Sequence, residues 1–189
     1  AMIYHDLRSP LGNIISSLDM MSDMAPKDEA IQSMLAIAGN STARIQRLIN
    51  SLLDINRLES GQPVADQKAA DPLELIYEAI RNVEPSAAGR RQVIQKNIPG
   101  RLPPVWVDVD MIQRVLINLL ENAIKFTPTD RNIEIGAEPD GIFVKMWVRD
   151  SGPGIPIGDQ ERIFEKFTRL RGKDKPGGLG VGLAFCKLA

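Results

Sequence analysis

Two stretches near the start of the sequence carry apolar residues with heptad spacing. This spacing predicts that each stretch forms an amphipathic helix. In residues 2–23 and again in residues 28–60, apolar positions step by three and four, which places them on one helical face. The first set is Leu7, Leu11, Ile14, Leu18 and Met21, and the second is Ile31, Met34, Ala38, Ser41, Ile45, Leu48, Leu52 and Ile55. A short segment, 22–27, contains Pro26 and separates them, so we predict an antiparallel helical hairpin.

A single hairpin leaves part of both apolar faces in water. Two hairpins that pair into a four-helix bundle bury these faces, so the pattern predicts a symmetric dimer. Gly61 and Pro63 provide a helix stop at the end of the second helix. We therefore expect a hairpin domain over residues 1–60, followed by a linker over residues 61–70.

Residues 71–189 are predicted to form an α/β domain. Asp71, which is followed by a proline, can cap a helix that runs to about Ala88. Asp108 can cap a second helix over residues 109–126. Strands are predicted at 93–98, 105–107, 132–138 and 142–149, with a hairpin turn at Pro139, Asp140 and Gly141.

Composition excludes several classes of protein. Hydrophobic residues make up 43% and charged residues 25%, and the net charge is -1, which gives no electrostatic case for nucleic acid or an anionic membrane. The sequence has neither a signal peptide nor a membrane-length apolar run, and Cys186 is its single cysteine, so we expect a cytoplasmic setting. Cys186, Trp106 and Trp147 lie in apolar patterns and are predicted to be core residues.

His5 is the only histidine, and it is followed directly by Asp6. A carboxylate beside an imidazole can orient the ring or accept its proton. The small polar residues one and two turns further along the predicted helix leave this face open to a bulky partner. Taken alone, these residues fit better with the commoner case, a surface histidine with a chance acidic neighbour.

Asn118, Asn122 and Lys125 follow one face of the helix predicted over 109–126. Amide oxygens are suitable ligands for Mg²⁺, and the lysine adds a point charge for phosphates. By spacing alone, the same stripe is also typical of an ordinary solvated helix face.

Two glycine-rich segments complete the pattern. Asp150 follows a predicted strand and begins the run Asp-Ser-Gly-Pro-Gly-Ile, where a buried carboxylate can accept a hydrogen bond from an exocyclic amine. Residues 177–183 form a glycine run before a short predicted helix, an arrangement that favours phosphate groups, although the same features occur in plain turns. A basic, glycine-flanked segment at 172–176 is predicted to be a mobile lid.

The order of these motifs resembles that of sensor histidine kinases of two-component systems. His-Asp-Leu-Arg-Ser-Pro is followed by the asparagine stripe, Asp-x-Gly-x-Gly, Phe-x-x-Phe and the glycine run, over nearly the whole chain. The resemblance implies a dimerisation and phosphotransfer hairpin, then a Bergerat-type ATP-binding α/β sandwich. It also implies that the protein is a histidine kinase that uses ATP and Mg²⁺ and has a response-regulator receiver domain as its partner.

Roles for individual residues follow from the same resemblance. His5 matches the phosphoacceptor, Asp6 the acid that helps to deprotonate it, and Arg169 an arginine that reaches the γ-phosphate. Asn122 matches the magnesium ligand. The other matches to the nucleotide site are Asn118, Lys125, Phe126, Asp150, Gly152, Gly154, Gly178, Gly180, Gly182 and Leu183.

A Bergerat ATPase that uses nucleotide as a conformational clamp is the main alternative. Such proteins carry a glutamate four residues before the magnesium asparagine, where this chain has Asn118. A non-catalytic scaffold is a third possibility, but all the motif positions are filled.

Two departures from the family pattern remain. Ser9 replaces the Thr or Asn that is usual in members with phosphatase activity, and the sequence stops at Ala189, before the family's last strands, so we expect a truncated sandwich.

Overall fold

The computed structural model describes residues 12–18, 20–21, 31–35, 37–39, 42, 45, 49, 55, 66–168 and 180–189. The chain divides into two compact units, Ala1–Ser60 and Gly61–Ala189. No helix among the described residues has the length and apolar character needed to cross a membrane.

The described residues of the first unit are helical, as the heptad pattern predicts. Ser17 and Thr42 each donate a side-chain hydrogen bond of 2.8 Å to the carbonyl oxygen four residues earlier. Several residues of the predicted apolar seams are exposed in the single chain, namely Ile14, Met21, Ile31, Met34 and Ile45. Ile55, by contrast, is fully buried.

The two long helices of the second unit begin where the sequence predicts. Asp71 Oδ1 accepts a hydrogen bond of 2.9 Å from Leu73 N–H at the start of α3 (Pro72–Gly89). Asp108 caps α4 (Val109–Phe126) in the same way: its Oδ1 accepts from Met111 N–H at 2.9 Å. The second oxygen of Asp108 accepts from Asp66 N–H at 3.0 Å, so one carboxylate also holds the backbone that enters the unit.

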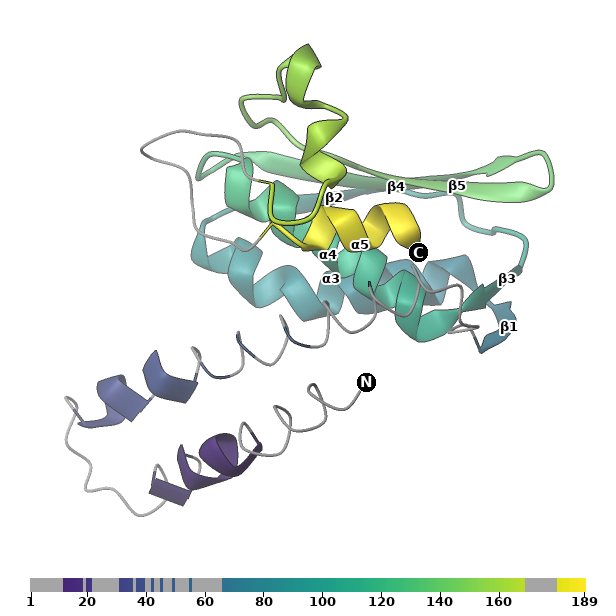
Figure 1. Ribbon diagram of the computed structural model, residues 1–189. Coiled ribbons are helices and arrows are strands. Elements are labelled where there is room, and N and C mark those ends of the chain that lie inside the picture. Colours follow the sequence, from purple (N-terminus) through teal and green to yellow (C-terminus); the bar gives the residue numbers. More distant parts are fainter. Residues whose placement is uncertain are drawn as a thin grey trace. The chain divides into compact units, whose positions relative to one another are not determined.

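Two small sheets accompany these helices (Figure 1). In the first, β1 (Gln67–Ala70) pairs antiparallel with β3 (Val105–Asp108). In the second, β4 (Asn132–Asp140) lies between parallel β2 (Val93–Asn97) and antiparallel β5 (Phe143–Arg149). The remaining elements are the 3₁₀ turns η1 (Ile157–Asp159) and η2 (Arg162–Phe164) and the short helix α5 (Gly182–Leu188).

The core lies between the three-stranded sheet and the helices, which cover one of its faces (Figure 1). Each helix contributes an apolar stripe with helical spacing, and β4 contributes alternate residues. The buried residues include Leu75, Ile76, Ala79, Ile80 and Val83 of α3, Leu116, Leu120, Ala123 and Ile124 of α4, and Ile133, Ile135 and Ala137 of β4. This packing fixes α4 against the sheet along its length.

Three features differ from the sequence prediction. Residues 67–70 belong to strand β1 rather than to a linker, and their pairing with β3 explains the strand. The β4–β5 turn is at Gly141 and Ile142 rather than at 139–141, because the ladder continues to the pair Asp140–Phe143. Trp106 is 68% exposed, since the flanking Val105 and Val107 point to the core and alternation turns the tryptophan outward.

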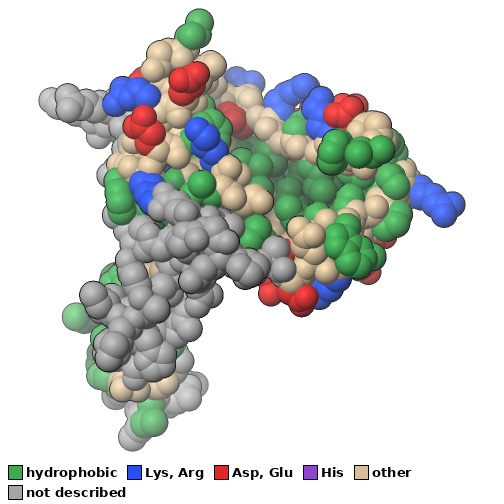
Figure 2. Space-filling model, turned by 45° about the vertical axis from the view of Figure 1, so that its right-hand side comes forward, with side chains coloured by type: hydrophobic (Ala, Val, Ile, Leu, Met, Phe, Trp, Pro, Cys, Tyr) green, Lys and Arg blue, Asp and Glu red, His purple; other side chains and the backbone are tan. Residues whose placement is uncertain are grey.

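Trp147 is half-buried and lies over Gly136, its partner across the β4–β5 ladder. A side chain at position 136 would overlap the indole ring. Elsewhere in the second unit, hydrophobic side chains gather in a hollow with charged residues at its rim (Figure 2).

Candidate functional site

One face of α4 carries the predicted polar stripe. The side chains of Asn118, Asn122 and Lys125 are all half-buried. Within residues 66–168 and 180–189, neither amide side chain has a hydrogen-bond partner. Lys125 Nζ lies 4.7 Å from the centroid of the Phe126 ring. The stripe therefore leaves two amide groups available to a ligand, close to a lysine and an aromatic ring.

The loop after β5 lies against the C-terminal end of α4. A Cβ built on Gly152 would lie 3.0 Å from the Phe126 carbonyl oxygen and 2.7 Å from Asp150 Oδ1. The Gly152 N–H donates a hydrogen bond of 2.7 Å to Asp150 Oδ1. Only glycine fits this close approach without moving the loop or the helix. The contact brings Asp150 close to Phe126.

Asp150 is exposed, and the expectation of a buried carboxylate is wrong for this structure. Strand β5 ends at Arg149, whose partner across the ladder is Glu134, so Asp150 lies beyond the last paired residue. Ser151 Oγ donates to the Asn132 carbonyl oxygen at 3.0 Å and fixes the chain at this edge of the sheet. No neighbouring strand therefore covers the carboxylate.

Gly182, in the described part of the glycine run, meets the other end of the stripe. Gly182 begins α5, and a Cβ built on it would lie 3.1 Å from Asn118 Oδ1. Gly180 has a φ of +70°, and its Cβ would lie 2.5 Å from the Thr168 carbonyl oxygen. The Gly180 carbonyl oxygen accepts from Phe167 N–H at 2.9 Å. Glycine is thus required at 180 by backbone conformation, whereas a side chain at 182 would press on the Asn118 amide.

These contacts assemble much of the predicted nucleotide site. Described residues from the prediction are Asn118, Asn122, Lys125, Phe126, Asp150, Gly152, Gly154, Gly180, Gly182 and Leu183. The predicted residues outside the described part of the chain are His5, Asp6, Ser9, Arg169 and Gly178. Gly154 makes no close approach, because a Cβ there would meet nothing within 4 Å, and its φ of +72° accounts for the glycine. Leu183 is half-buried in the first turn of α5.

Two family models match the chain in the order that the motifs predict. The His Kinase A (phospho-acceptor) domain matches residues 1–61. The histidine kinase-, DNA gyrase B- and HSP90-like ATPase model matches residues 107–189.

Known proteins resemble the chain over almost its whole length. Sensor protein KdpD of Escherichia coli (strain K12) is 34% identical, over 99% of this chain and 21% of KdpD. The adaptive-response sensory kinase SasA of Synechococcus sp. (strain JA-2-3B'a(2-13)) is 34% identical, over 99% of this chain and 51% of SasA. The chain belongs to the sensor histidine kinases. It spans only about a fifth of KdpD and about half of SasA.

A solved structure has the same fold. The crystal structure of full-length ShkA in complex with AMPPNP aligns with a TM-score of 0.80 and 25% identity, over 100% of this chain and 39% of the ShkA chain. In the present chain, His5 and Asp6 fall within the match to the phosphoacceptor domain. All the residues predicted to hold nucleotide fall within the ATPase match. Residues 62–106, which include β1, α3 and β2, lie between the two matches.

Sequence motifs miss one residue that contacts the site's main helix. Gln92 is 5% exposed, and its Nε2 donates to three carbonyl oxygens at the C-terminal end of α4. The only signal in the sequence is a polar residue directly before strand β2, which is too common to single out.

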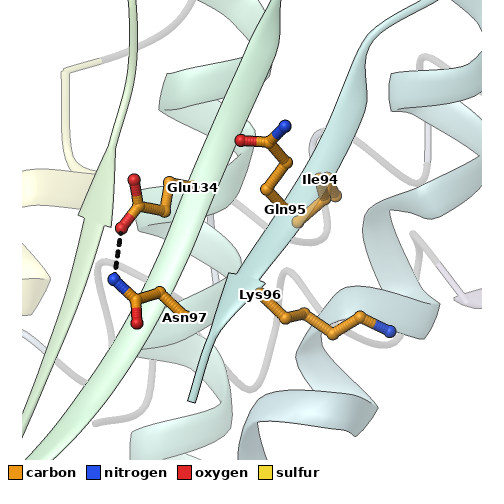
Figure 3. Close-up of a pocket in the computed structure, with 5 residues that line it drawn as sticks. All are labelled: Ile94, Gln95, Lys96, Asn97 and Glu134. Atoms are coloured by element: carbon orange, nitrogen blue, oxygen red, sulfur yellow. Dashed lines mark hydrogen bonds between the residues drawn. The ribbon is translucent and has the colours of Figure 1, made fainter.

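A hollow of about 580 Å³ lies along β2 and β4, away from the predicted residues. Its lining includes Gln95, Lys96, Asn97 and Glu134. Asn97 and Glu134 point toward one another across the strands, with a hydrogen bond of 3.0 Å between them (Figure 3). None of the residues that the sequence predicts for the nucleotide site lines this hollow.

Cys186 is a packing residue, as predicted. Its Sγ lies 3.8 Å from the Val115 carbonyl oxygen, in the contact between α5 and α4. Burial raises the pKa of the thiol to about 11, so it stays protonated near neutral pH. The raised pKa and the contact with α4 agree with a packing role.

Proposed function

We propose that this sensor histidine kinase binds ATP with Mg²⁺, transfers the γ-phosphoryl group to His5, and then passes it to an aspartate of a receiver domain. The observation that supports nucleotide binding most directly is the pair of close glycine contacts at the ends of the α4 stripe. Gly182 approaches Asn118 and Gly152 approaches Phe126, so backbone passes close to a face that holds Lys125 and two amides with no side-chain hydrogen bond to the described residues. The solved relative with AMPPNP supports the same proposal.

The residues at the C-terminal end of α4 and the start of the following loop would hold the base and the phosphates. The Asp150 carboxylate is positioned to accept a hydrogen bond from the adenine amine, because it is exposed and already oriented by the Gly152 N–H. Phe126 is 37% exposed and can lie along the nucleotide. The ammonium group of Lys125, close to that ring, can reach a phosphate.

The donor set of α4 fits a magnesium ion. Asn122 would hold it through its amide oxygen, with Asn118 one turn away near the phosphates. When bound, Mg²⁺ supplies positive charge that offsets the charge of the phosphate oxygens. Neutral amide ligands preserve that charge, whereas carboxylates would cancel part of it.

Phosphoryl transfer then requires His5 to approach the γ-phosphorus. An imidazole nitrogen of His5 forms the N–P bond as the bond between the γ-phosphorus and the ADP oxygen breaks. Asp6 orients the ring and accepts the proton from the other ring nitrogen. Arg169 offsets the charge that develops on the transferred group. In the second step, the receiver aspartate attacks phosphorus and the N–P bond breaks.

The hairpin is proposed to pair with a second copy of the chain. Large apolar residues of the predicted seams are exposed in the single chain, Met34 by 69% and Met21 by 57%. Burial of these side chains in a four-helix bundle provides the driving force for the dimer.

Labelling with γ-labelled ATP and Mg²⁺ tests the proposal. We expect acid-labile, base-stable label on the chain and none on His5→Gln. This variant is expected to bind nucleotide like the wild type, because His5 does not hold ATP. Asn122→Ala is expected to lose both labelling and MgATP binding.

Two results would contradict this function. Label that persists on His5→Gln would show that another residue accepts the phosphoryl group. Phosphate release without protein labelling would favour the clamp ATPase instead.

Ser9 leads us to expect that kinase activity exceeds phosphatase activity toward the partner. A phosphorylated receiver domain should lose its label at nearly the same rate with and without this chain. Loss that is much faster in its presence would contradict the expectation.

A further inference from the structure

Gln92 joins three segments at the end of α4. Its backbone N–H donates to the Ala87 carbonyl oxygen at 3.0 Å, at the end of α3. Its side-chain Nε2 donates to the carbonyl oxygens of Ile124 at 3.1 Å, Thr127 at 2.8 Å and Pro128 at 3.2 Å. An amide NH₂ group has two hydrogens, so the three acceptors share them. Gln92 is thus fixed by one helix and in turn fixes the end of the next.

The carbonyl groups of Ile124 and Thr127 need a hydrogen-bond donor from outside α4. The last carbonyls of a helix lack partners within it. At the end of α4, Thr127 N–H satisfies only the Ala123 oxygen, at 2.9 Å. Ile124 and Thr127 are 5% and 0% exposed, so water does not satisfy their carbonyl groups as it would at a surface. The buried Gln92 amide supplies the missing hydrogen bonds.

Neighbouring residues hold the same segment more weakly. One guanidinium nitrogen of Arg90 donates to the Thr127 carbonyl oxygen at 3.4 Å. Arg91 and Asp130 form an exposed bidentate ion pair at 2.5 and 2.8 Å. Of these three residues, only Gln92 makes a buried hydrogen bond to a residue within α4, namely to the carbonyl group of Ile124.

Lys125 and Phe126 lie between two fixed points. On one side, Gln92 holds the carbonyl groups of Ile124 and Thr127. On the other, Gly152 packs against the Phe126 carbonyl group. We propose that Gln92 is a positioning residue for nucleotide binding, which sets the place of Lys125 and Phe126 through the end of α4. This inference rests on the proposed function and adds a residue that touches no ligand.

Gln113 provides a matched control. Among the described residues, it is the second buried glutamine that reaches from one element to another, with 9% exposure. Its Nε2 donates to the Leu75 carbonyl oxygen at 3.1 Å and to Glu78 Oε2 at 3.0 Å, which ties α4 to α3 away from the stripe's end. Replacement of either glutamine by methionine removes a buried amide donor and keeps the side-chain length.

The test compares Gln92→Met and Gln113→Met in the full 189-residue chain. Dissociation constants for ATP and for adenosine are measured by calorimetry with Mg²⁺, well below the unfolding midpoints. We expect Gln92→Met to raise the Kd for ATP about tenfold, which corresponds to about 1.4 kcal/mol. The rise for adenosine is expected to be smaller, because Lys125 is expected to contact phosphate. Gln113→Met should lower thermal stability but keep both Kd values within about twofold.

The outcomes separate the possibilities. If Gln92→Met loses stability but binds ATP like the wild type, Gln92 is only a helix cap and the inference is wrong. Equal weakening by both variants would attribute the effect to general stability and also overturn it. If Gln92→Met does not fold, Gln92→Asn decides in its place, since its shorter amide reaches fewer of the carbonyl groups. A wild-type chain that binds no nucleotide would refute the proposed function, and the inference with it.

Discussion

Gly182 and Asn118 lie so close together that a Cβ on the glycine would be 3.1 Å from the asparagine Oδ1. The contact joins the start of α5 to the middle of α4, and it places Gly182 beside the amide stripe. The Asn118 amide therefore keeps its position only because residue 182 has no side chain.

Gly182→Ala should weaken MgATP binding without lowering the free energy of unfolding. The added methyl group forces the Asn118 amide to move, so we expect the affinity for MgATP to fall several-fold. Alanine is the better helix former by up to about 1 kcal/mol, so the free energy of unfolding should not fall. Calorimetry and urea denaturation measure the two quantities. Unchanged affinity would mean that Asn118 tolerates the displacement and does not define the site.

Asp150→Asn tests the proposed contact to the base. The amide keeps an oxygen for the Gly152 N–H but presents an NH₂ group to the adenine amine, so we expect ATP affinity to fall about tenfold or more. Because Asp150 is exposed, stability should stay within about 0.5 kcal/mol of the wild type. Asp140→Asn, at the exposed end of β4, is the control and should bind ATP normally. Equal affinities of the two variants would remove Asp150 from the site.

Because the Cys186 thiol is largely buried, we expect the free energy of unfolding to fall at alkaline pH. Burial raises the pKa of the folded-state thiol from 9.0 to about 11. The protonated thiol is thus favoured in the folded chain, and this contribution is complete below pH 9 and is lost as pH rises to about 11. The shift corresponds to an order of magnitude of about 3 kcal/mol.

Urea denaturation at several pH values checks this prediction by comparison with Cys186→Ala. Both proteins share all other titrating groups, so only the slope of stability against pH between 9 and 11 is compared. The wild type should show the steeper decline. Parallel curves would indicate that the thiol ionises equally in the folded and unfolded states.

Gly136→Ala should displace Trp147, because the methyl group would overlap the indole ring. We expect a loss of about 1–3 kcal/mol, as for other overpacked positions. The measurement is tryptophan fluorescence in a Trp106→Phe background, which removes the exposed tryptophan. A red-shifted emission and a lower unfolding midpoint are expected. An unchanged spectrum would mean that the ring does not lie over position 136.

Capping residues made the two long helices predictable. Asp71 and Asp108 mark the starts of α3 and α4, and the observed bounds agree with the prediction. Strand β1 was missed because Gln67–Ala70 is short, mostly exposed and without apolar alternation. Its pairing partner is distant in sequence, so no local pattern reveals it.

The sequence motifs predicted which residues belong to the candidate site but not how separate segments contact one another. Asn118, Asn122 and Lys125 have a spacing that indicates a common face, and the structure confirms that they share α4. The contacts of Gly152 and Gly182 with that helix depend on tertiary packing, which no spacing records. The same is true of Gln92, whose three acceptors come from a different part of the chain.

Asp108 has a mechanical consequence. One of its oxygens begins α4, and the other holds the Asp66 N–H where the backbone enters the unit. A pull on the chain at Asp66 therefore reaches the first turn of α4 in two ways, through this carboxylate and through the ladder in which Gln67 pairs with Asp108. The helix that carries Asn118 and Asn122 thus bears directly any load applied at that point.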